Sequence, residues 1–238
     1  MRARTWFGST FSMIAVALIG VASLTPAAHA AMISYDLTHV FTGQQPDSTS
    51  PWGTIKFDDG GGSGTVTVTV TASLEDTSEF ISFWGFNGPD PASGVSIVQG
   101  SGPTATINQC SKSDPTACNA GTFKADGDGF YAYVFDFGNG NLNNSDVAVF
   151  TITSPGITAA SFDETSVGGS NGSYHTAAHL QGINTNGGSC SAWVGDSQGT
   201  PNEFTPGTCG AVAEPSILLF VGLGLVGMAG VTRRFYSR

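Results

Sequence analysis

The sequence predicts an all-β protein: an antiparallel β-sandwich with jelly-roll or Greek-key connections, placed between a signal peptide and a C-terminal transmembrane helix. Short runs in which apolar and polar residues alternate recur along the chain. Clusters of Gly, Pro and Asn separate these runs, as turns do between strands. No segment of residues 31–211 has the apolar period of a helix, so we assign this stretch to one exported β-domain.

Residues 1–30 have the organisation of a secretory signal peptide. Arg2 and Arg4 form a basic start, residues 11–24 are apolar, and Ala28-His29-Ala30 is a small-residue cleavage site. An uncleaved membrane anchor is the alternative. The apolar run is short for a membrane span, which favours cleavage.

Four segments of the domain have strand patterns. In residues 65–71 the valines Val66, Val68 and Val70 share one face and threonines share the other, as in a half-buried strand. Residues 79–86 and 146–153 are further strands. Residues 130–137 are apolar on both faces, which predicts a central strand covered on both sides, with one face made of Tyr131, Tyr133, Phe135 and Phe137.

The charge of the domain is strongly negative. Its cations are Lys56, Lys112 and Lys124, whereas seventeen of the chain's 18 Asp and Glu residues lie in it. Because nucleic-acid binding depends on Lys and Arg neutralising phosphates, this balance excludes nucleic acid as a partner.

Four cysteines lie in the exported part, and an even number in an oxidising compartment predicts disulfides. Three pairings are open. We expect Cys110–Cys118 and Cys190–Cys209, which close two local loops. The spacings match neither a zinc site nor a redox C-x-x-C motif.

Acidic Gly-rich loops offer oxygen atoms at short spacing, as calcium sites do. Asp126 and Asp128 are the candidate ligands of a structural Ca²⁺, the one cofactor that the sequence suggests. An ordinary turn is the alternative, because Asp and Gly favour turns for conformational reasons.

No catalytic residue is predicted. His175 and His179 are four residues apart, but on a strand they would be about 13 Å apart, too far for one metal ion. Residues 168–172 match G-x-S-x-G around Ser170, yet the strand-to-helix context of a nucleophile elbow is missing. We therefore interpret this stretch as a loop.

Aromatic side chains are the candidates for contact with sugars, because they present flat apolar rings with polar edges. Core packing is the alternative for most of them. The candidates are Trp52, Phe83, Trp84, Tyr131, Tyr133 and Trp193.

The C-terminal residues 212–238 combine a short polar turn, an apolar segment and a basic end. Residues 216–232 contain no charge and are long enough for a minimal transmembrane helix. Arg233 and Arg234 follow directly. Because basic residues stay on the cytoplasmic side, the domain is expected outside the inner membrane.

This tail resembles the PEP-CTERM sorting signal of Gram-negative bacteria, through Glu214, Pro215, Ser216, the apolar segment and the arginines. Ala213 stands where the motif has its first proline, a departure that bears on cleavage. The resemblance implies an exosortase-type processing enzyme as a partner. Residues 66–70, 80, 83–87, 178–183, 187–189 and 193–195 are similar to segments of other exported PEP-CTERM proteins.

We therefore expect an exported, non-enzymatic protein with a structural or adhesive role, associated with exopolysaccharide. Its precursor would be anchored in the inner membrane by residues 216–232, and the mature protein would reach the outer cell surface or the extracellular matrix. A secreted hydrolase acting on glycans or esters is the alternative.

Overall fold

The computed structural model describes residues 30–111, 124–125, 128–140, 142–170, 172–185, 188–197 and 200–201. The tail of residues 212–238 lies outside this part of the chain, as does the predicted signal peptide apart from its last residue. None of the described helices has the length and apolar character needed to cross a membrane.

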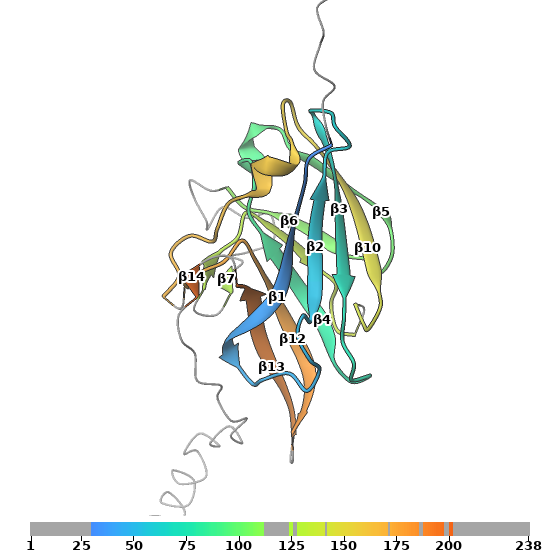
Figure 1. Ribbon diagram of the computed structural model, residues 1–238, viewed down its shortest axis with the longest axis vertical. Coiled ribbons are helices and arrows are strands. Elements are labelled where there is room, and N and C mark those ends of the chain that lie inside the picture. The colour runs from blue at the N-terminus through green and yellow to red at the C-terminus, as the bar shows by residue number, and fades with distance from the viewer. Residues whose placement is uncertain are drawn as a thin grey trace, which may run out of the picture.

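The described residues form an antiparallel β-structure with almost no helix, which confirms the predicted all-β class (Figure 1). Ten strands make one sheet in the order β5-β10-β3-β2-β1-β13-β12-β4-β9-β6. They are β1 (Met32–Gly43), β2 (Gly53–Asp58), β3 (Thr65–Ala72), β4 (Phe80–Phe86), β5 (Ser96–Ser101), β6 (Thr106–Gln109), β9 (Tyr133–Asp136), β10 (Val147–Thr153), β12 (Thr176–Thr185) and β13 (Gly188–Asp196).

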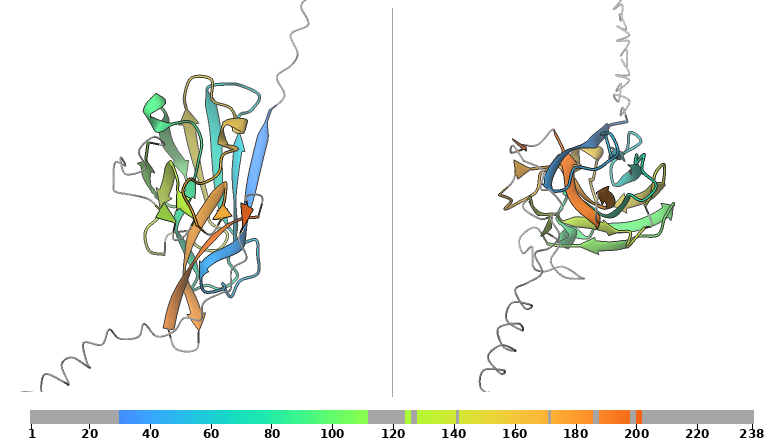
Figure 2. Two further views of the ribbon diagram at one scale, coloured as in Figure 1. Left: turned by 90° about the vertical axis from the view of Figure 1, so that its left-hand side faces the viewer. Right: turned by 90° about the horizontal axis from the view of Figure 1, so that it is seen from below.

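Strand β1 joins the two halves of this sheet. Its first part, Met32 to Asp36, pairs with β2, and its second part, Leu37 to Gly43, pairs with β13. Register shifts in the second part bend the strand. The sheet therefore curls into a nearly closed barrel, seen end-on in Figure 2, rather than separating into the two sheets of the predicted sandwich.

The core lies inside this curled sheet, where side chains of the two halves meet. Val66, Val68 and Val70 of β3 are fully buried there, as their alternation with threonines predicts. Rings from opposite halves are in contact: the centroids of Phe135 and Phe150 are 3.7 Å apart. The inward faces thus bury the aromatic rings that the sequence supplies in unusual number.

The segment 130–137 is where the strand prediction is wrong in detail. It divides into β8 (Gly129–Phe130) and β9, with a break at Tyr131 and Ala132. Because of this break, Tyr131 does not share a face with Tyr133 and Phe135. It packs with Val134 in a second apolar cluster, so the prediction that both faces are covered is confirmed.

The remaining elements are short. β7 (Lys124–Ala125) pairs with β8, and β11 (Gly172–Ser173) pairs with β14 (Thr200–Pro201). Two 3₁₀ helices, η1 (Pro91–Ser93) and η2 (Ala159–Phe162), lie in connections between strands. Through Ala125, β7 contributes to the second cluster, which lies on the outer face of the sheet.

Candidate functional site: an aromatic pocket on the outer sheet face

Three partly exposed rings form a row across the outer face of β13, β12 and β4. We call Trp193, His179 and Phe83 the aromatic row. The strand register places Trp193 opposite His179, and His179 opposite Phe83. Their neighbours in sequence, Val194, Leu180 and Trp84, point inward and are buried. The row is thus the outward half of an ordinary strand alternation.

The three rings of the aromatic row are neighbours across the sheet, with His179 between Trp193 and Phe83. Trp193 and His179 are stacked with centroids 4.8 Å apart, and the His179 and Phe83 centroids are 6.2 Å apart. The Nδ1 atom of His179 lies 3.1 Å from Ser82 Oγ. The imidazole is thus held by Ser82 and by the Trp193 ring, and it is inclined by 33° to the Phe83 ring.

A second row, next to the first, is made of small residues. Gly195 pairs with Ala177, Ala177 with Gly85, and Gly85 with Val134. The Tyr131 ring covers Gly85, where a Cβ atom would stand 2.9 Å from the ring. Tyr174 covers Gly195 in the same way, with a corresponding distance of 2.7 Å. Only glycine leaves room for two tyrosine rings lying directly on the sheet.

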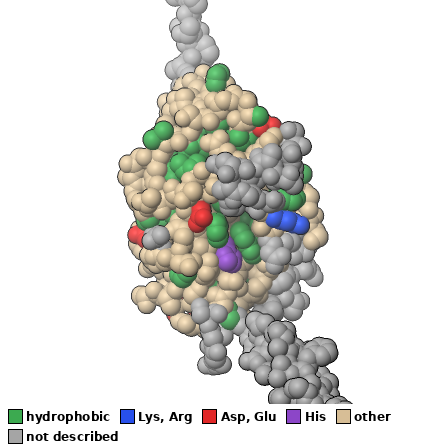
Figure 3. Space-filling view, turned by 180° about the vertical axis from the view of Figure 1, so that it is seen from behind, with side chains coloured by type: hydrophobic (Ala, Val, Ile, Leu, Met, Phe, Trp, Pro, Cys, Tyr) green, Lys and Arg blue, Asp and Glu red, His purple; other side chains and the backbone are tan. Residues whose placement is uncertain are grey.

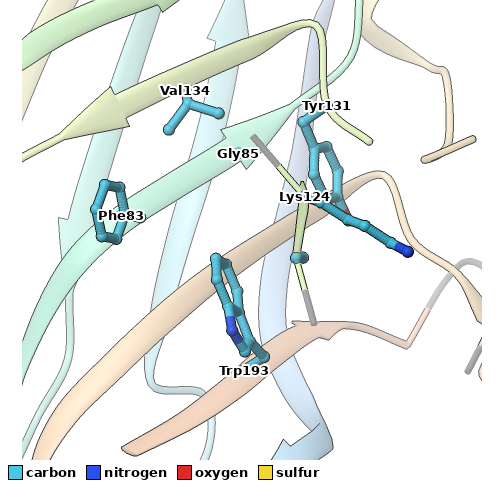
Figure 4. Close-up of a pocket in the computed structure, with 7 residues that line it drawn as sticks. Phe83, Gly85, Lys124, Tyr131, Val134 and Trp193 are labelled. Carbon is cyan, nitrogen blue, oxygen red and sulfur yellow. The ribbon is translucent and has the colours of Figure 1, made fainter. Parts of the chain in front are cut away.

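Members of both rows, together with Tyr131 and β7, line a pocket of about 260 Å³ (Figure 4). It is mostly apolar, and it is slightly smaller than the about 300–1,000 Å³ typical of drug-sized ligand sites. Its volume therefore suits one ring-sized group. The residues that line it are Phe83, Gly85, Lys124, Ala125, Tyr131, Val134 and Trp193.

The back view shows hydrophobic side chains beside a histidine, with an Asp or Glu side chain close to them and a Lys or Arg side chain farther along the same face (Figure 3). In the close-up, Lys124 extends across the Tyr131 ring and away from Phe83 and Trp193 (Figure 4). The Lys124 ammonium lies 5.6 Å from the centroid of the Phe130 ring, within the range of a cation–π contact. The pocket thus has an aromatic side and a cationic rim.

A buried carboxyl group holds one of the rings that line the pocket. Asp128 is fully buried; it accepts a short hydrogen bond from the Tyr131 hydroxyl and a 2.5 Å bond from Ser166 Oγ. Burial raises the pKa of Asp128 to about 6, partly offset by these hydrogen bonds. Burial also raises the pKa of Tyr131 well above its usual value. Asp128 therefore fixes the ring that covers Gly85.

The calcium prediction stays untested. Asp126 lies outside the described residues, and the Asp128 carboxylate is directed to Ser166 and Tyr131. Within the part of the chain that the structure describes, no group of three or more His, Cys, Asp or Glu side chains is arranged to hold a metal ion.

His175 and His179 have different surroundings. Nδ1 of His175 is 3.0 Å from the buried carboxylate of Asp196, its Nε2 is 3.3 Å from Asp163, and its ring stacks on Tyr35 at 4.4 Å. The Tyr35 hydroxyl donates to Asp163 as well. This polar network connects β1, the end of η2 and β13, and it is separate from the aromatic row.

Of the six aromatic candidates, three lie in the core: Trp52, Trp84 and Tyr133 are buried there. The structure brings the other three, Phe83, Tyr131 and Trp193, to the pocket. Sequence reasoning missed His179, the two covered glycines and Lys124 as parts of this site. The sequence held one signal for the site: in residues 80–87 and 193–195, the residues that alternate with the buried ones should point outward.

Ser170 and the four cysteines are the remaining residues that the sequence singled out. Ser170 is exposed in the loop before β11, with no helix following it. Neither Cys110 at the end of β6 nor Cys190 in β13 is a free cysteine. Cys118 and Cys209 lie outside the described residues, so the predicted pairing stays a prediction.

No protein-family profile, curated protein or solved structure matches the chain. The resemblance of residues 212–238 to a sorting signal therefore rests on Glu214, Pro215 and the residues that follow them.

Proposed function

We propose that this is an exported, non-enzymatic protein that binds polysaccharide through the aromatic pocket and has a structural or adhesive role in the cell envelope or extracellular matrix. The observation that supports this most is the aromatic row beside a ring-sized pocket. Sugar rings have apolar faces that stack on flat aromatic side chains, while their hydroxyl groups remain in water. Trp193 and Phe83 offer such partly exposed faces.

The segments of the β-domain that resemble other exported PEP-CTERM proteins support the same site. Residues 83–87, 178–183 and 193–195 belong to β4, β12 and β13, which are neighbours in the sheet. They supply Phe83, His179 and Trp193, the whole aromatic row. Segments far apart in the sequence thus contribute to one surface.

The tail supplies the proposed destination. Residues 216–232 would anchor the precursor in the inner membrane, and an exosortase-type enzyme would act near Glu214 and Pro215. The mature protein would then reach the outer surface or the matrix, where exopolysaccharide is available.

The chemistry of the pocket favours binding over hydrolysis. Glycoside hydrolysis uses two carboxyl groups on either side of the scissile bond. The described residues that line this pocket include no Asp or Glu, and the hydroxyl of Tyr131 is engaged by Asp128. His179 is held by stacking and by Ser82.

Retention on immobilised exopolysaccharide from the native cells tests this proposal. We expect the mature protein to be retained, and Trp193→Ala to weaken its affinity about tenfold or more, equivalent to about 1.4 kcal/mol, because the largest stacking surface is lost. Val98→Ala is the matched control: Val98 is 62% exposed on β5, outside the pocket lining, and should keep wild-type retention.

Two outcomes would contradict the proposal. Equal retention of the Trp193→Ala and wild-type proteins would remove the pocket from the function. Release of sugar fragments or ester cleavage that Ser170→Ala or His179→Ala abolishes would establish the hydrolase instead.

A further inference from the structure

We infer that the pocket selects an anionic sugar, one that carries a carboxylate or sulfate group, with Lys124 as the residue that recognises the charge. This inference rests on the proposed function and adds the class of sugar. Lys124 is a cation in a strongly acidic protein, and it lies at the rim of the pocket.

Cations are rare here, and the two in the described part of the chain differ in their partners. Lys56 on β2 forms an ion pair with Asp58, with the nitrogen 3.3 Å from the carboxylate oxygen. For Lys124 the described residues provide no ion-pair partner; its ammonium lies near the Phe130 ring. Among the described residues, none neutralises this ammonium, which is therefore available to a negatively charged ligand.

The placement of Lys124 fits a ligand with two kinds of surface. Trp193 and Phe83 lie on one side of the pocket, and the Lys124 side chain leaves on the other, past Tyr131 (Figure 4). A sugar ring stacked on the aromatic side would direct a ring substituent toward this rim. A compact, flexible ammonium group suits a carboxylate or sulfate at that place.

The net charge of −10 does not oppose such binding at physiological salt. At an ionic strength of about 0.15 M, interactions between exposed charges are screened beyond about 8 Å. Carboxylates beyond this range therefore repel an acidic sugar weakly. Asp136 is nearer, because it pairs with Phe83 on the aromatic side of the pocket, whereas Lys124 lies on the other side. The acidic group of a bound sugar is therefore expected to face Lys124.

Calorimetry with a pair of oligosaccharides of identical backbone tests the inference. Oligogalacturonate carries one carboxylate per sugar, and its full methyl ester carries none. We expect the acid to bind the mature protein about fivefold more tightly than the ester. Lys124→Gln should remove this difference and leave the affinity for the ester unchanged, whereas Lys56→Gln should preserve it. Trp193→Ala should weaken binding of both oligosaccharides.

The possible failures can be told apart. Equal affinity for acid and ester, a Lys124→Gln protein indistinguishable from Lys56→Gln, or no binding of either oligosaccharide would overturn the inference. The polysaccharide function itself would stand as long as Trp193→Ala weakened retention on the native exopolysaccharide and no hydrolysis was found.

Discussion

Asp128 is the residue whose surroundings differ most from what its sequence context suggests. In the sequence it belongs to an Asp-Gly turn, with a calcium ligand as one interpretation. In the structure its carboxyl group is buried and hydrogen-bonded to Ser166 and to Tyr131, which lines the pocket. Nothing in the local sequence indicates this, because Ser166 comes from a loop far along the chain.

Asp128 should make the protein more stable at mildly acidic pH than at neutral pH. Its pKa is about 6 in the folded state and about 3.9 in an unfolded chain. Between these values the folded state holds a proton that the unfolded state has released, so stability falls as pH rises through about 6. Between pH 4.5 and pH 7 the expected loss is about 2 kcal/mol. Urea unfolding at these two pH values measures it.

Asp128→Asn should flatten this dependence. Asp58→Asn is the control, because hydrogen bonding to the Gly60 amide lowers the pKa of Asp58, and its effect therefore appears below about pH 4. If the Asp128→Asn protein lost as much stability between pH 4.5 and pH 7 as the wild-type protein does, Asp128 would not be the group responsible.

The strands themselves were predictable where alternation was strong. Val66, Val68 and Val70 face the core of β3 as their spacing requires, and β4 and β10 begin within one residue of the predicted boundaries. The alternation failed at Tyr131. There the chain leaves β8 before it enters β9, and a two-residue break reverses the side on which an aromatic residue lies.

The row of small residues across β13, β12 and β4 should be sensitive to a single methyl group. Gly85→Ala would place a Cβ atom 2.9 Å from the Tyr131 ring and displace it, at a cost of about 1–3 kcal/mol in stability. Denaturant unfolding measures the cost, and calorimetry with the sugar oligomer should show weaker binding.

Gly100→Ala is the matched control on β5. A Cβ atom there would lie 3.6 Å from Val149 O, an ordinary contact, so stability should change by less than about 0.5 kcal/mol. If the two alanine variants were equally stable, Tyr131 would not be fixed on Gly85 as we describe.

At the scale of the molecule, the all-β class followed from composition and turn spacing, whereas the continuous sheet did not. Its closure depends on β1, which pairs with β2 and then with β13. Pairing between strands so distant in sequence depends on the packed core and leaves no local pattern. The pocket could not be predicted for the same reason, since its residues come from β4, β7, β9 and β13 and the break before β9.

The proposed removal of the C-terminal tail can be detected from the mass of the mature protein. If the tail is removed, the protein recovered from the cell surface or medium should begin near Ala31 and end near Pro215 by intact-mass measurement, and the inner-membrane fraction should hold the longer precursor. Ala213→Pro completes the first part of the Pro-Glu-Pro motif and should not slow conversion. Surface protein that retains residues 216–238 would show that the tail is an anchor instead.

The double pairing of β1 also sets the order in which the domain can form. A chain that crosses a membrane from its N-terminus delivers β1 first, but the partner of the second half of β1 ends at Asp196, near the end of the domain. Until that strand has emerged, Val40 and Phe41 have no neighbouring strand on this side, and the barrel stays open along one seam. If the domain is exported as we propose, folding is then delayed to the end of translocation, and the contacts between distant segments make it slow. During that interval β1 is an exposed edge strand, which can pair with another chain.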